Sequence, residues 1–462
     1  MKQIVLLPGF LCLFLLFSCK KDVVTPENDT LHSPAFSRNI VADAVTGYDD
    51  TWTLQSQLDA GNVTLIAGKV YNITGLSVTH ALDLNGATIN MTNTSSGSTA
   101  LSLDAAGASV TNGTLKGNWN NTTPGNPSSV TGMFIRAANC SISHVTVSSF
   151  PAFGILAGPY NNPSVTYCTI QNTGYVSFFF DAESRSTTGG TFSNNIVDRS
   201  MIAASTVSQM AVGIRGSRAD STIITSQWTV SGNTIKMPYH PAASAAECME
   251  VRYFNNSTIN NNIVTGGSIG ISVVNCKGVT VSRNSITYTK LESLELATCV
   301  NCFSISNFIS GSAGVGELID GSSNGVTLMG DFITNTTQGC IHAYNNTTNL
   351  TITACTLKAS VGVRAINLQG ADKTIIRNTT IEGNGVATVA IMLDTCPGNL
   401  AISGGSISNF KTCVIAIYNC KAGLITDNVT MSGVTVAGVQ NPLSSYIQNG
   451  ALLGSNIIVV NH

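Results

Sequence analysis

The sequence predicts an all-β protein: a single-stranded, right-handed parallel β-helix of about 14 coils, with a short helix capping its N-terminal end. Three observations lead to this fold class. A short pattern recurs about every 23 residues, and apolar and polar residues alternate with the period of a strand. In addition, only 10% of the 462 residues are charged while 43 are glycine, and that charged share is far below the usual value of about 25%.

The repeat consists of an apolar residue, four mostly polar residues that often include Asn, and a second apolar residue. Examples are VSGNTI (230–235) and VSRNSI (281–286). Its first residue marks each coil, for instance Val281, Ile305 and Leu328. A step of about 23 residues is too short for a propeller blade of about 40–45 residues. It fits a coil of three short strands, with Asn and Gly at corners that need a left-handed backbone.

The first 19 residues have the features of a secretory signal: one Lys, then an apolar run from Ile4 to Phe17 that is too short to span a bilayer. The sequence LFSC (16–19) resembles the lipobox of bacterial lipoproteins, and KKD (20–22) resembles the start of Bacteroidetes-type lipoproteins. This resemblance implies lipidation of Cys19, a flexible tether over residues 20–40, and anchoring at the outer membrane on the cell surface. An ordinary signal peptide with a chance Cys is the alternative.

The remaining residues, 41–462, are expected to form the β-helix domain. Its opening contains Asp49-Asp50-Thr51 at the start of a short helix, a strand, a Gly-x-x-Tyr turn (Gly68, Tyr71) and LDLNGATI (82–89). This order resembles the opening of the pectate-lyase superfamily of right-handed β-helices, although that family usually has Pro where Ala67 stands. The resemblance covers about 45 residues and implies the fold. The helix would shield strand edges at the open end of the stack.

One strand of each coil, about nine residues before the repeat, gathers the scarce charged side chains. Its rows include CMEVRY (248–253), GISVVN (270–275) and SLELAT (293–298). Alternation places Met249 and Val251 inward, and Glu250 and Arg252 outward. Stacking the rows predicts a polar stripe along one outer face, formed by Arg136, Asp181, Arg215, Glu250, Arg252, Glu295, Asp320, His342 and Tyr344.

Three long spacings predict loops inserted at about 117–130, 199–210 and 237–247. All three precede the strand that carries the polar stripe, so they would wall it into a groove. The loops bring aromatic side chains, which suit the apolar faces of sugar rings. We therefore expect a polysaccharide partner, contacted by Asp181, Arg215, Arg252, His342, Tyr344, Trp119 and His240.

Glu250, Glu295 and Asp320 are the candidate catalytic residues. Glu250 and Glu295 would lie two rungs apart in one column, about 9.6 Å at the backbone. That is near the roughly 6.5–9.5 Å that separates the carboxyl groups of an inverting glycosidase. Asp320, one rung beyond Glu295 and offset sideways, forms a competing pair with it. Neighbouring carboxylates raise one pKa and suit that group to donate a proton.

Other interpretations stay open. A polysaccharide lyase would need a base and a cation near the substrate, for which Arg215, Arg252, His342 and Tyr344 are available. The motif sets of familiar β-helix hydrolases and lyases are missing, which favours a non-catalytic adhesin or glycan-binding module. Each glutamate could also be only a solvated outward residue.

The composition excludes some functions. The net charge of −2 gives no electrostatic case for nucleic acid. Of 13 cysteines, 11 remain once Cys12 and Cys19 are set aside, and an odd number does not fit a disulfide framework. A ladder of buried thiols is expected instead at one coil position, formed by Cys276, Cys299, Cys396 and Cys420. No cofactor or metal is expected, and the oligomeric state stays open.

Overall fold

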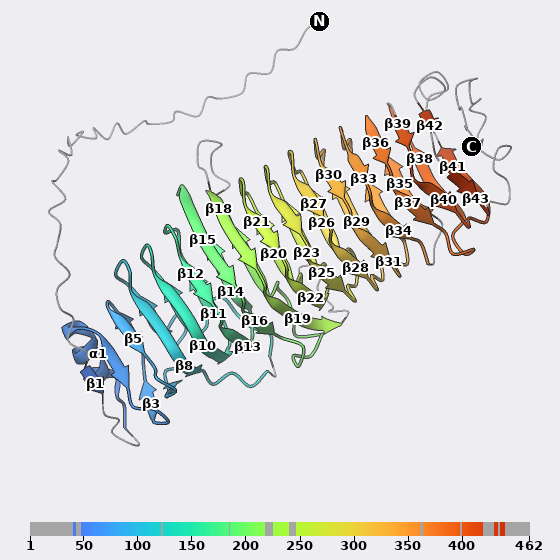
Figure 1. Cartoon of the computed structure of the whole chain (residues 1–462). Helices are drawn as coiled ribbons and strands as arrows, with labels where there is room; N and C mark the ends of the chain where they lie inside the picture. The colour runs from blue at the N-terminus through green and yellow to red at the C-terminus, as the bar shows by residue number, and fades with distance from the viewer. Residues whose placement is uncertain are drawn as a thin grey trace, which may run out of the picture. The chain divides into compact units, whose positions relative to one another are not determined.

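The computed structural model describes residues 40–42, 48–121, 123–183, 185–217, 225–239, 246–360, 364–397, 400–418, 429–432 and 435–438. Across these ranges the chain winds as a parallel β-helix, and the strands stack in chain order (Figure 1). This confirms the predicted fold class. The predicted signal, tether and Cys19, and residues 439–462, lie outside the described residues.

A single helix, α1 (Thr51–Ala60), precedes most of the stack in the described chain. Leu54 and Leu58 are its buried residues, one turn apart, and they join the main core. The carboxylate of Asp49 accepts a hydrogen bond from the Thr51 backbone N–H (2.9 Å) at the start of the helix. The expected capping helix is therefore present. In the described ranges, no helix is long and apolar enough to cross a membrane.

The strands form two sheets. Sheet 1 has 14 described strands: β4 (Leu76–Val78), β7 (Thr99–Leu103), β9 (Thr131–Ile135), β11 (Phe153–Ala157), β14 (Val176–Asp181), β17 (Val212–Arg215), β20 (Met249–Arg252), β23 (Ile271–Val274), β26 (Leu294–Ala297), β29 (Val315–Asp320), β32 (Gly339–Ala343), β35 (Arg364–Gln369), β38 (Val389–Asp394) and β41 (Cys413–Tyr418).

Sheet 2 has 29 described strands in two columns that meet at a corner. The first column contains β1 (Ile40–Ala42), β2 (Val63–Leu65), β5 (Ala81–Asp83), β8 (Ser109–Lys116), β10 (Ser141–Phe150), β12 (Ser164–Thr166), β15 (Thr187–Ser193), β18 (Thr225–Ser231), β21 (Thr258–Asn260), β24 (Thr280–Ser282), β27 (Phe303–Ile305), β30 (Thr327–Met329), β33 (Thr351–Thr353), β36 (Thr374–Arg377), β39 (Leu400–Ser403) and β42 (Val429–Ser432). The second contains β3 (Val70–Ile73), β6 (Thr88–Met91), β13 (Thr169–Thr173), β16 (Ile196–Asp198), β19 (Thr234–Tyr239), β22 (Ile263–Gly267), β25 (Ser285–Thr287), β28 (Phe308–Ser310), β31 (Phe332–Thr334), β34 (Thr356–Lys358), β37 (Thr380–Glu382), β40 (Ser406–Ser408) and β43 (Thr435–Ala437). β8 and β10 run through both columns.

A ladder of buried asparagines fixes the corner of sheet 2. Asn262 shows the pattern: its side-chain amide donates to Val230 O (3.0 Å) on one neighbouring coil and to Asn284 Oδ1 (2.9 Å) on the other. These bonds satisfy polar groups that the corner would otherwise bury unpaired. The ladder explains why Asn recurs in the sequence repeat, and it is formed by Asn195, Asn233, Asn262, Asn284 and Asn307, ending on Asp331.

Met249 and Val251, which were predicted to face inward, lie in the core, but the coil marker Ile305 does not. In β27, Ser304 takes the inward position opposite Val281, and Ile305 points outward. The reason is a polar cluster inside the stack. Ser304 donates a hydrogen bond to Glu317 (2.8 Å), whose side chain is only 1% exposed. The coil marker in that rung is therefore Ser304, and the prediction for Ile305 was wrong.

The predicted cysteines share one coil position, but the column is only partly thiol: Cys276 and Cys299 lie on adjacent rungs, and Ser323, Thr347 and Ala371 separate them from Cys396. Cys276, Cys299 and Cys396 are all buried, and Cys276 and Cys299 form no disulfide. Cys302 is also free, so CVNC (299–302) forms no disulfide. Cys420 lies outside the described residues.

Candidate functional site

The outer face of sheet 1 carries the polar stripe in the predicted register. Glu250 pairs with Ser272, and Ser272 pairs with Glu295, so the two glutamates share one column two rungs apart. On the next rung, Asp320 lies opposite Ala297, two residues further along the strand than Glu295. The relative backbone positions inferred for the three candidate carboxylates are thereby confirmed.

Glu250 is the centre of a closed ion cluster. Its carboxylate lies 2.6 Å from Arg215 Nε on one oxygen and 2.6 Å from Arg252 on the other. The Glu250 side chain is 2% exposed, whereas the two arginines are about a third exposed. Both oxygens thus bind guanidinium groups, and the buried carboxylate presents almost no surface to a substrate. This arrangement favours a role in positioning the two arginines over a role in proton transfer.

Glu295 lies in a different environment, without a cation bound to it. The Ser272 hydroxyl donates to Glu295 Oε2 (2.5 Å). Burial raises the pKa of Glu295, and the charge of Asp320 adds to this effect, while the Ser272 hydrogen bond and Arg252 act against it. The side chain remains half-buried at the surface. Glu295 therefore combines access to solvent with a carboxyl group that holds its proton to higher pH.

Two further glutamates surround Glu295. Burial raises the pKa of Glu247 to about 7, with Glu250 and Glu295 as additional causes, and its Oε2 is buried without a hydrogen-bond partner. Burial also raises the pKa of Glu292, with the charges of Glu295 and Asp320 contributing. When several carboxyl groups lie close together, the charge of each ionised group raises the pKa of its neighbours, so that some of the groups stay protonated. Glu292 lies in a turn, outside the strand rows, and so alignment of those rows did not reveal it.

Asp320 ends β29 beside this acidic group. Its Oδ1 accepts hydrogen bonds from the Gly321 backbone N–H (2.7 Å) and from the Asn345 side-chain amide (2.5 Å). Both donors bind the same oxygen, which leaves Oδ2 of this half-buried residue available to a ligand. Asn345 belongs to the turn after β32, and sequence reasoning did not single it out because alternation along the row gives it no contact with Asp320.

His342 and Tyr344 form a neutral pair on the C-terminal side of the carboxylates. His342 Nε2 donates to Gln338 O (3.1 Å), so Nδ1 accepts from the Tyr344 hydroxyl (2.6 Å). Burial lowers the pKa of His342 to about 4, and Arg364 contributes. The Tyr344 hydroxyl also accepts a hydrogen bond from Asn367 (3.1 Å). His342 is 2% exposed, so it orients Tyr344 and does not itself face a ligand.

The other predicted contact residues are spread more widely. Asp181 pairs with Arg215 on the adjacent rung, within the stripe. Trp119 is partly buried and packs against the core, in the coil that leads to β9. The strand that carries Glu250, β20, lies four rungs further along the stack than β9. Four rungs correspond to about 19 Å, so Trp119 does not join the carboxylates. His240 lies outside the described residues. Its neighbour Tyr239 is 58% exposed and faces the Tyr288 ring at 6.5 Å.

The inserted loop at 199–210 reaches the stripe. The guanidinium of Arg199, fully buried, donates to the carbonyls of Gln209, Met210 and Gly174 at 3.0, 2.9 and 3.1 Å. These bonds tie the end of the loop to the coil of β14. Met210 Sδ then lies 3.9 Å from an Arg215 nitrogen, which places this loop beside the ion cluster. The described part of the loop therefore flanks the stripe, as expected.

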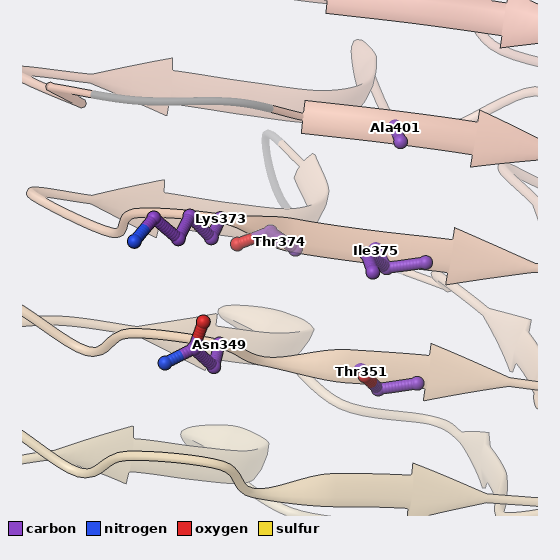
Figure 2. Close-up of a pocket in the computed structure, with 6 residues that line it drawn as sticks. All are labelled: Asn349, Thr351, Lys373, Thr374, Ile375 and Ala401. Atoms are coloured by element: carbon purple, nitrogen blue, oxygen red, sulfur yellow. The ribbon is translucent and has the colours of Figure 1, made fainter.

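A surface pocket of about 370 Å³ lies elsewhere, on β33, β36 and β39 of sheet 2 (Figure 2). It contains none of the stripe residues, and is lined by Asn349, Thr351, Lys373, Thr374, Ile375 and Ala401. Among the described residues, no group of three or more His, Cys, Asp or Glu side chains is arranged to hold a metal ion.

No protein-family model and no curated protein sequence matches this chain. Solved structures similar to it include the Dettilon tailspike protein, with a TM-score of 0.55 and 13% identity over 71% of this chain and 68% of that one. The A-module of the Azotobacter vinelandii mannuronan C-5 epimerase AlgE6 has a TM-score of 0.47 and 16% identity, over 84% and 95% of the two chains. The catalytic unit of the Streptomyces thermodiastaticus GH87 α-1,3-glucanase has a TM-score of 0.46 and 15% identity, over 90% and 71%. Similarity at this level of identity shows the parallel β-helix fold alone.

Proposed function

We propose that this protein binds a polysaccharide along the polar stripe of sheet 1 and hydrolyses it, with Glu295 as the general acid and Asp320 as the general base. One observation carries the proposal: two half-buried carboxyl groups stand on neighbouring rungs of an outward face, and each keeps an oxygen that no cation occupies. Glu250 is not assigned a proton-transfer role, because both of its oxygens bind guanidinium groups.

The register gives the separation of this pair. Neighbouring rungs are about 4.8 Å apart, and two residues along a strand add about 6.6 Å at right angles, so the backbone positions of Glu295 and Asp320 are about 8 Å apart on the diagonal. Inverting glycosidases hold their two carboxyl groups roughly 6.5–9.5 Å apart, which leaves room for a water molecule, and this backbone spacing allows a carboxyl separation in that range. The expected reaction therefore inverts the anomeric configuration.

The proton balance of the step is simple. Glu295 donates its proton to the glycosidic oxygen as the bond from that oxygen to the anomeric carbon breaks. Asp320 accepts a proton from the water molecule whose oxygen attacks the anomeric carbon. Burial and neighbouring charge raise the pKa of Glu295, which keeps it protonated for this purpose. The products are two shorter chains, one with a new reducing end.

Hydrolysis fits the site better than β-elimination does. A lyase must neutralise the carboxylate of a uronate, but Arg215 and Arg252 are already bound to Glu250. The surrounding glutamates would also repel a uronate at the point of cleavage. The Tyr344 hydroxyl, which is hydrogen-bonded to His342, is the group that could exchange a proton with a uronate in a lyase, so its removal separates the two reactions in an experiment.

We also propose that the protein is held at the outer membrane surface by a lipid on Cys19, with residues 20–40 as the tether. The support is the lipobox-like sequence at residues 16–19. Metabolic labelling with a fatty-acid analogue should mark the full chain but not the Cys19→Ser variant. Labelling of neither would leave only an ordinary signal peptide, and equal labelling of both would place the lipid on a residue other than Cys19.

The activity test uses residues 20–462 with a panel of plant, algal and host polysaccharides. Reducing ends and the ultraviolet absorbance of unsaturated uronates are measured together. Reducing ends without absorbance, lost in Glu295→Gln and kept in the sheet 2 control Glu382→Gln, support hydrolysis. Absorbance in parallel with reducing ends would mean a lyase. No product, together with retention in a polysaccharide gel, would mean a non-catalytic binding module.

A further inference from the structure

The N-terminal part of the sheet 1 face carries three arginines stacked over aromatic rings. The Arg136 guanidinium lies 4.4 Å from the centre of the Phe134 ring, and Arg215 lies 5.3 Å from that of Phe179. A third pair, Arg185 and Tyr160, is 5.9 Å apart. Stacking of this kind holds a guanidinium flat and leaves its N–H edges directed away from the ring.

The aromatic residues form a floor that faces outward. Phe134 on β9 pairs with Leu156 on β11, and Leu156 pairs with Phe179 on β14, so all three occupy one column. Each is only half-buried, although the inward residues of the same strands fill the core. Apolar side chains at outward positions provide the flat surface that the C–H face of a sugar ring packs against.

Gly158 leaves the backbone bare beside two of the aromatic rings of this face. It follows β11, and a Cβ atom placed on it would come within 3.3 Å of the Tyr160 ring and 3.5 Å of the Phe134 ring. The two rings thus approach the same stretch of bare backbone, and each has an arginine stacked on it. A larger side chain at this position would come between the two rings. We give the name Gly158 cleft to the group formed by Phe134, Arg136, Gly158, Tyr160 and Arg185.

The two arginines of the cleft differ from the arginines of the ion cluster. Arg215 is bound to Glu250, but no carboxylate in the described part of the chain lies within ion-pair distance of Arg136 or Arg185. Both are exposed. The acidic side chains on neighbouring rungs are already hydrogen-bonded. Asp104, one rung from Arg136, accepts from the Ser77 and Ser102 hydroxyls (both 2.6 Å), and Asp181 accepts from the Glu183 backbone N–H (2.8 Å). A pair of unmatched guanidinium groups beside aromatic rings is suited to a planar or tetrahedral oxyanion carried on a sugar.

We propose that the Gly158 cleft binds an anionic sugar unit, with Arg136 and Arg185 recognising its carboxylate or sulfate group. This proposal rests on the proposed function, because it takes the anionic sugar to be part of the polysaccharide that the protein cleaves. The cleft lies five rungs from Glu295, or about 24 Å. The acidic unit is therefore held remote from the acidic residues at the cleavage point, and the polymer must be long enough to span both.

The test measures binding in the absence of cleavage. The full chain carrying Glu295→Gln is run in affinity gels that contain polygalacturonate, dextran sulfate or neutral dextran. Two further variants are made in that background: Arg136→Gln/Arg185→Gln, and Gly158→Val, which fills the cleft and keeps both charges. The matched control, Arg283→Gln/Arg377→Gln, removes two exposed arginines from sheet 2. Thermal unfolding confirms that every variant is folded.

The expected result is retention of the parent by at least one acidic polymer and not by dextran. Both cleft variants should bind that polymer about tenfold or more weakly, and the control pair should bind as the parent does. Retention by polygalacturonate identifies a uronate, and retention by dextran sulfate identifies a sulfated sugar. No retention by either acidic polymer overturns the proposal, as do an equal loss in the control pair and unchanged binding by Gly158→Val.

The two proposals fail separately. Cleavage of a neutral polysaccharide by the wild-type chain, with no retention on acidic polymers, would overturn the cleft proposal and leave hydrolysis standing. Arginine-dependent retention without cleavage of any polymer would overturn hydrolysis and leave the cleft proposal standing.

Discussion

Arg215 and Glu250 form an ion pair 2.6 Å long between neighbouring strands β17 and β20, and the carboxylate is almost completely buried. Arg252 binds the second oxygen of the same group. A carboxylate enclosed in this way acts as the counter-charge of two arginines. Its removal would leave both guanidinium groups partly buried and unpaired.

The Glu250→Gln variant should therefore be less stable than the wild type. Because the arginines are about a third exposed, solvent screening reduces the loss to about 1–3 kcal/mol from the 3–5 kcal/mol of a fully buried pair. Urea unfolding of Glu250→Gln beside Glu295→Gln measures this difference. Equal stability of the two variants would contradict the positioning role of Glu250.

The Glu295→Gln variant should lose cleavage and keep its fold. Glutamine can accept the Ser272 hydrogen bond but cannot donate an acidic proton, so the rate should fall by about 100-fold or more. Reducing-end assays on the substrate found in the panel give the rate, and thermal unfolding gives the stability. A variant that retains more than a tenth of the wild-type rate would exclude Glu295 as the acid.

The pH dependence of cleavage should report on Glu295. As a general acid it must be protonated, so activity falls as the pH rises through its raised pKa, which lies above the ordinary value of 4.5. The Ser272 hydroxyl stabilises the ionised form. Ser272→Ala should thus move the alkaline limb of the profile to higher pH. A limb that stays in place, or one that moves to lower pH, would show that another group controls it.

Tyr344→Phe separates hydrolysis from elimination. The Tyr344 hydroxyl donates to neutral His342, and it would be the group that exchanges a proton with a uronate in a lyase. In a hydrolase that uses Glu295 and Asp320, its loss should lower kcat by less than about tenfold. Loss of all activity in Tyr344→Phe, with activity kept in Glu295→Gln, would favour a lyase.

The buried carboxyl pair Glu317 and Asp331 should make the fold sensitive to alkali. Burial raises the pKa of both groups, that of Asp331 to about 6, and the charge of Asp331 further raises the pKa of Glu317. A raised folded pKa means that the folded chain holds protons that the unfolded chain releases above about pH 4–4.5. The stabilising effect is thus complete at low pH and is lost as the pH rises through the folded values, by about 1.4 kcal/mol per pH unit for each proton.

Melting temperatures at pH 5 and pH 8 test this dependence. The wild type should lose more stability between the two than Glu317→Gln does, because the variant has one group fewer to ionise. The control variant Glu382→Gln changes a glutamate that lies at the surface and pairs with Lys358 at 3.7 Å. Its melting temperature should depend on pH as that of the wild type does. An identical pH response in all three proteins would contradict the prediction.

The repeat made the rows of sheet 1 predictable. Inward and outward residues alternate along each strand, and the nearly constant number of residues per coil then fixes which residues of neighbouring strands pair. Glu250, Glu295 and Asp320 were placed correctly on the backbone for that reason. What each side chain binds was not predictable. The sequence indicates that Arg215, Glu250 and Arg252 share a face, but only the structure shows that the Glu250 carboxylate binds both arginines.

Ile305 shows where hydrophobic pattern fails. Ser304 faces inward, although polar residues usually face solvent. The search for an apolar residue at this point of the repeat therefore selected the neighbouring Ile305 as the coil marker. The corner asparagine contained the correct signal, since Asn284 follows Val281 by three residues and Asn307 follows Ser304 by three. The Gly158 cleft was missed for a different reason: its rings and arginines come from a strand and from the turns after neighbouring strands, which no single row contains.

The asparagine ladder has a consequence for redesign of this scaffold. An extra residue at its corner would withdraw a side-chain amide from two neighbours at once, so the disturbance would spread in both directions along the stack. The three long loops all enter at a different corner, ahead of sheet 1, where the chain already accommodates segments of unequal length. Foreign peptides grafted there would be displayed in a row at a repeat of about 4.8 Å per coil, with the asparagine spine undisturbed.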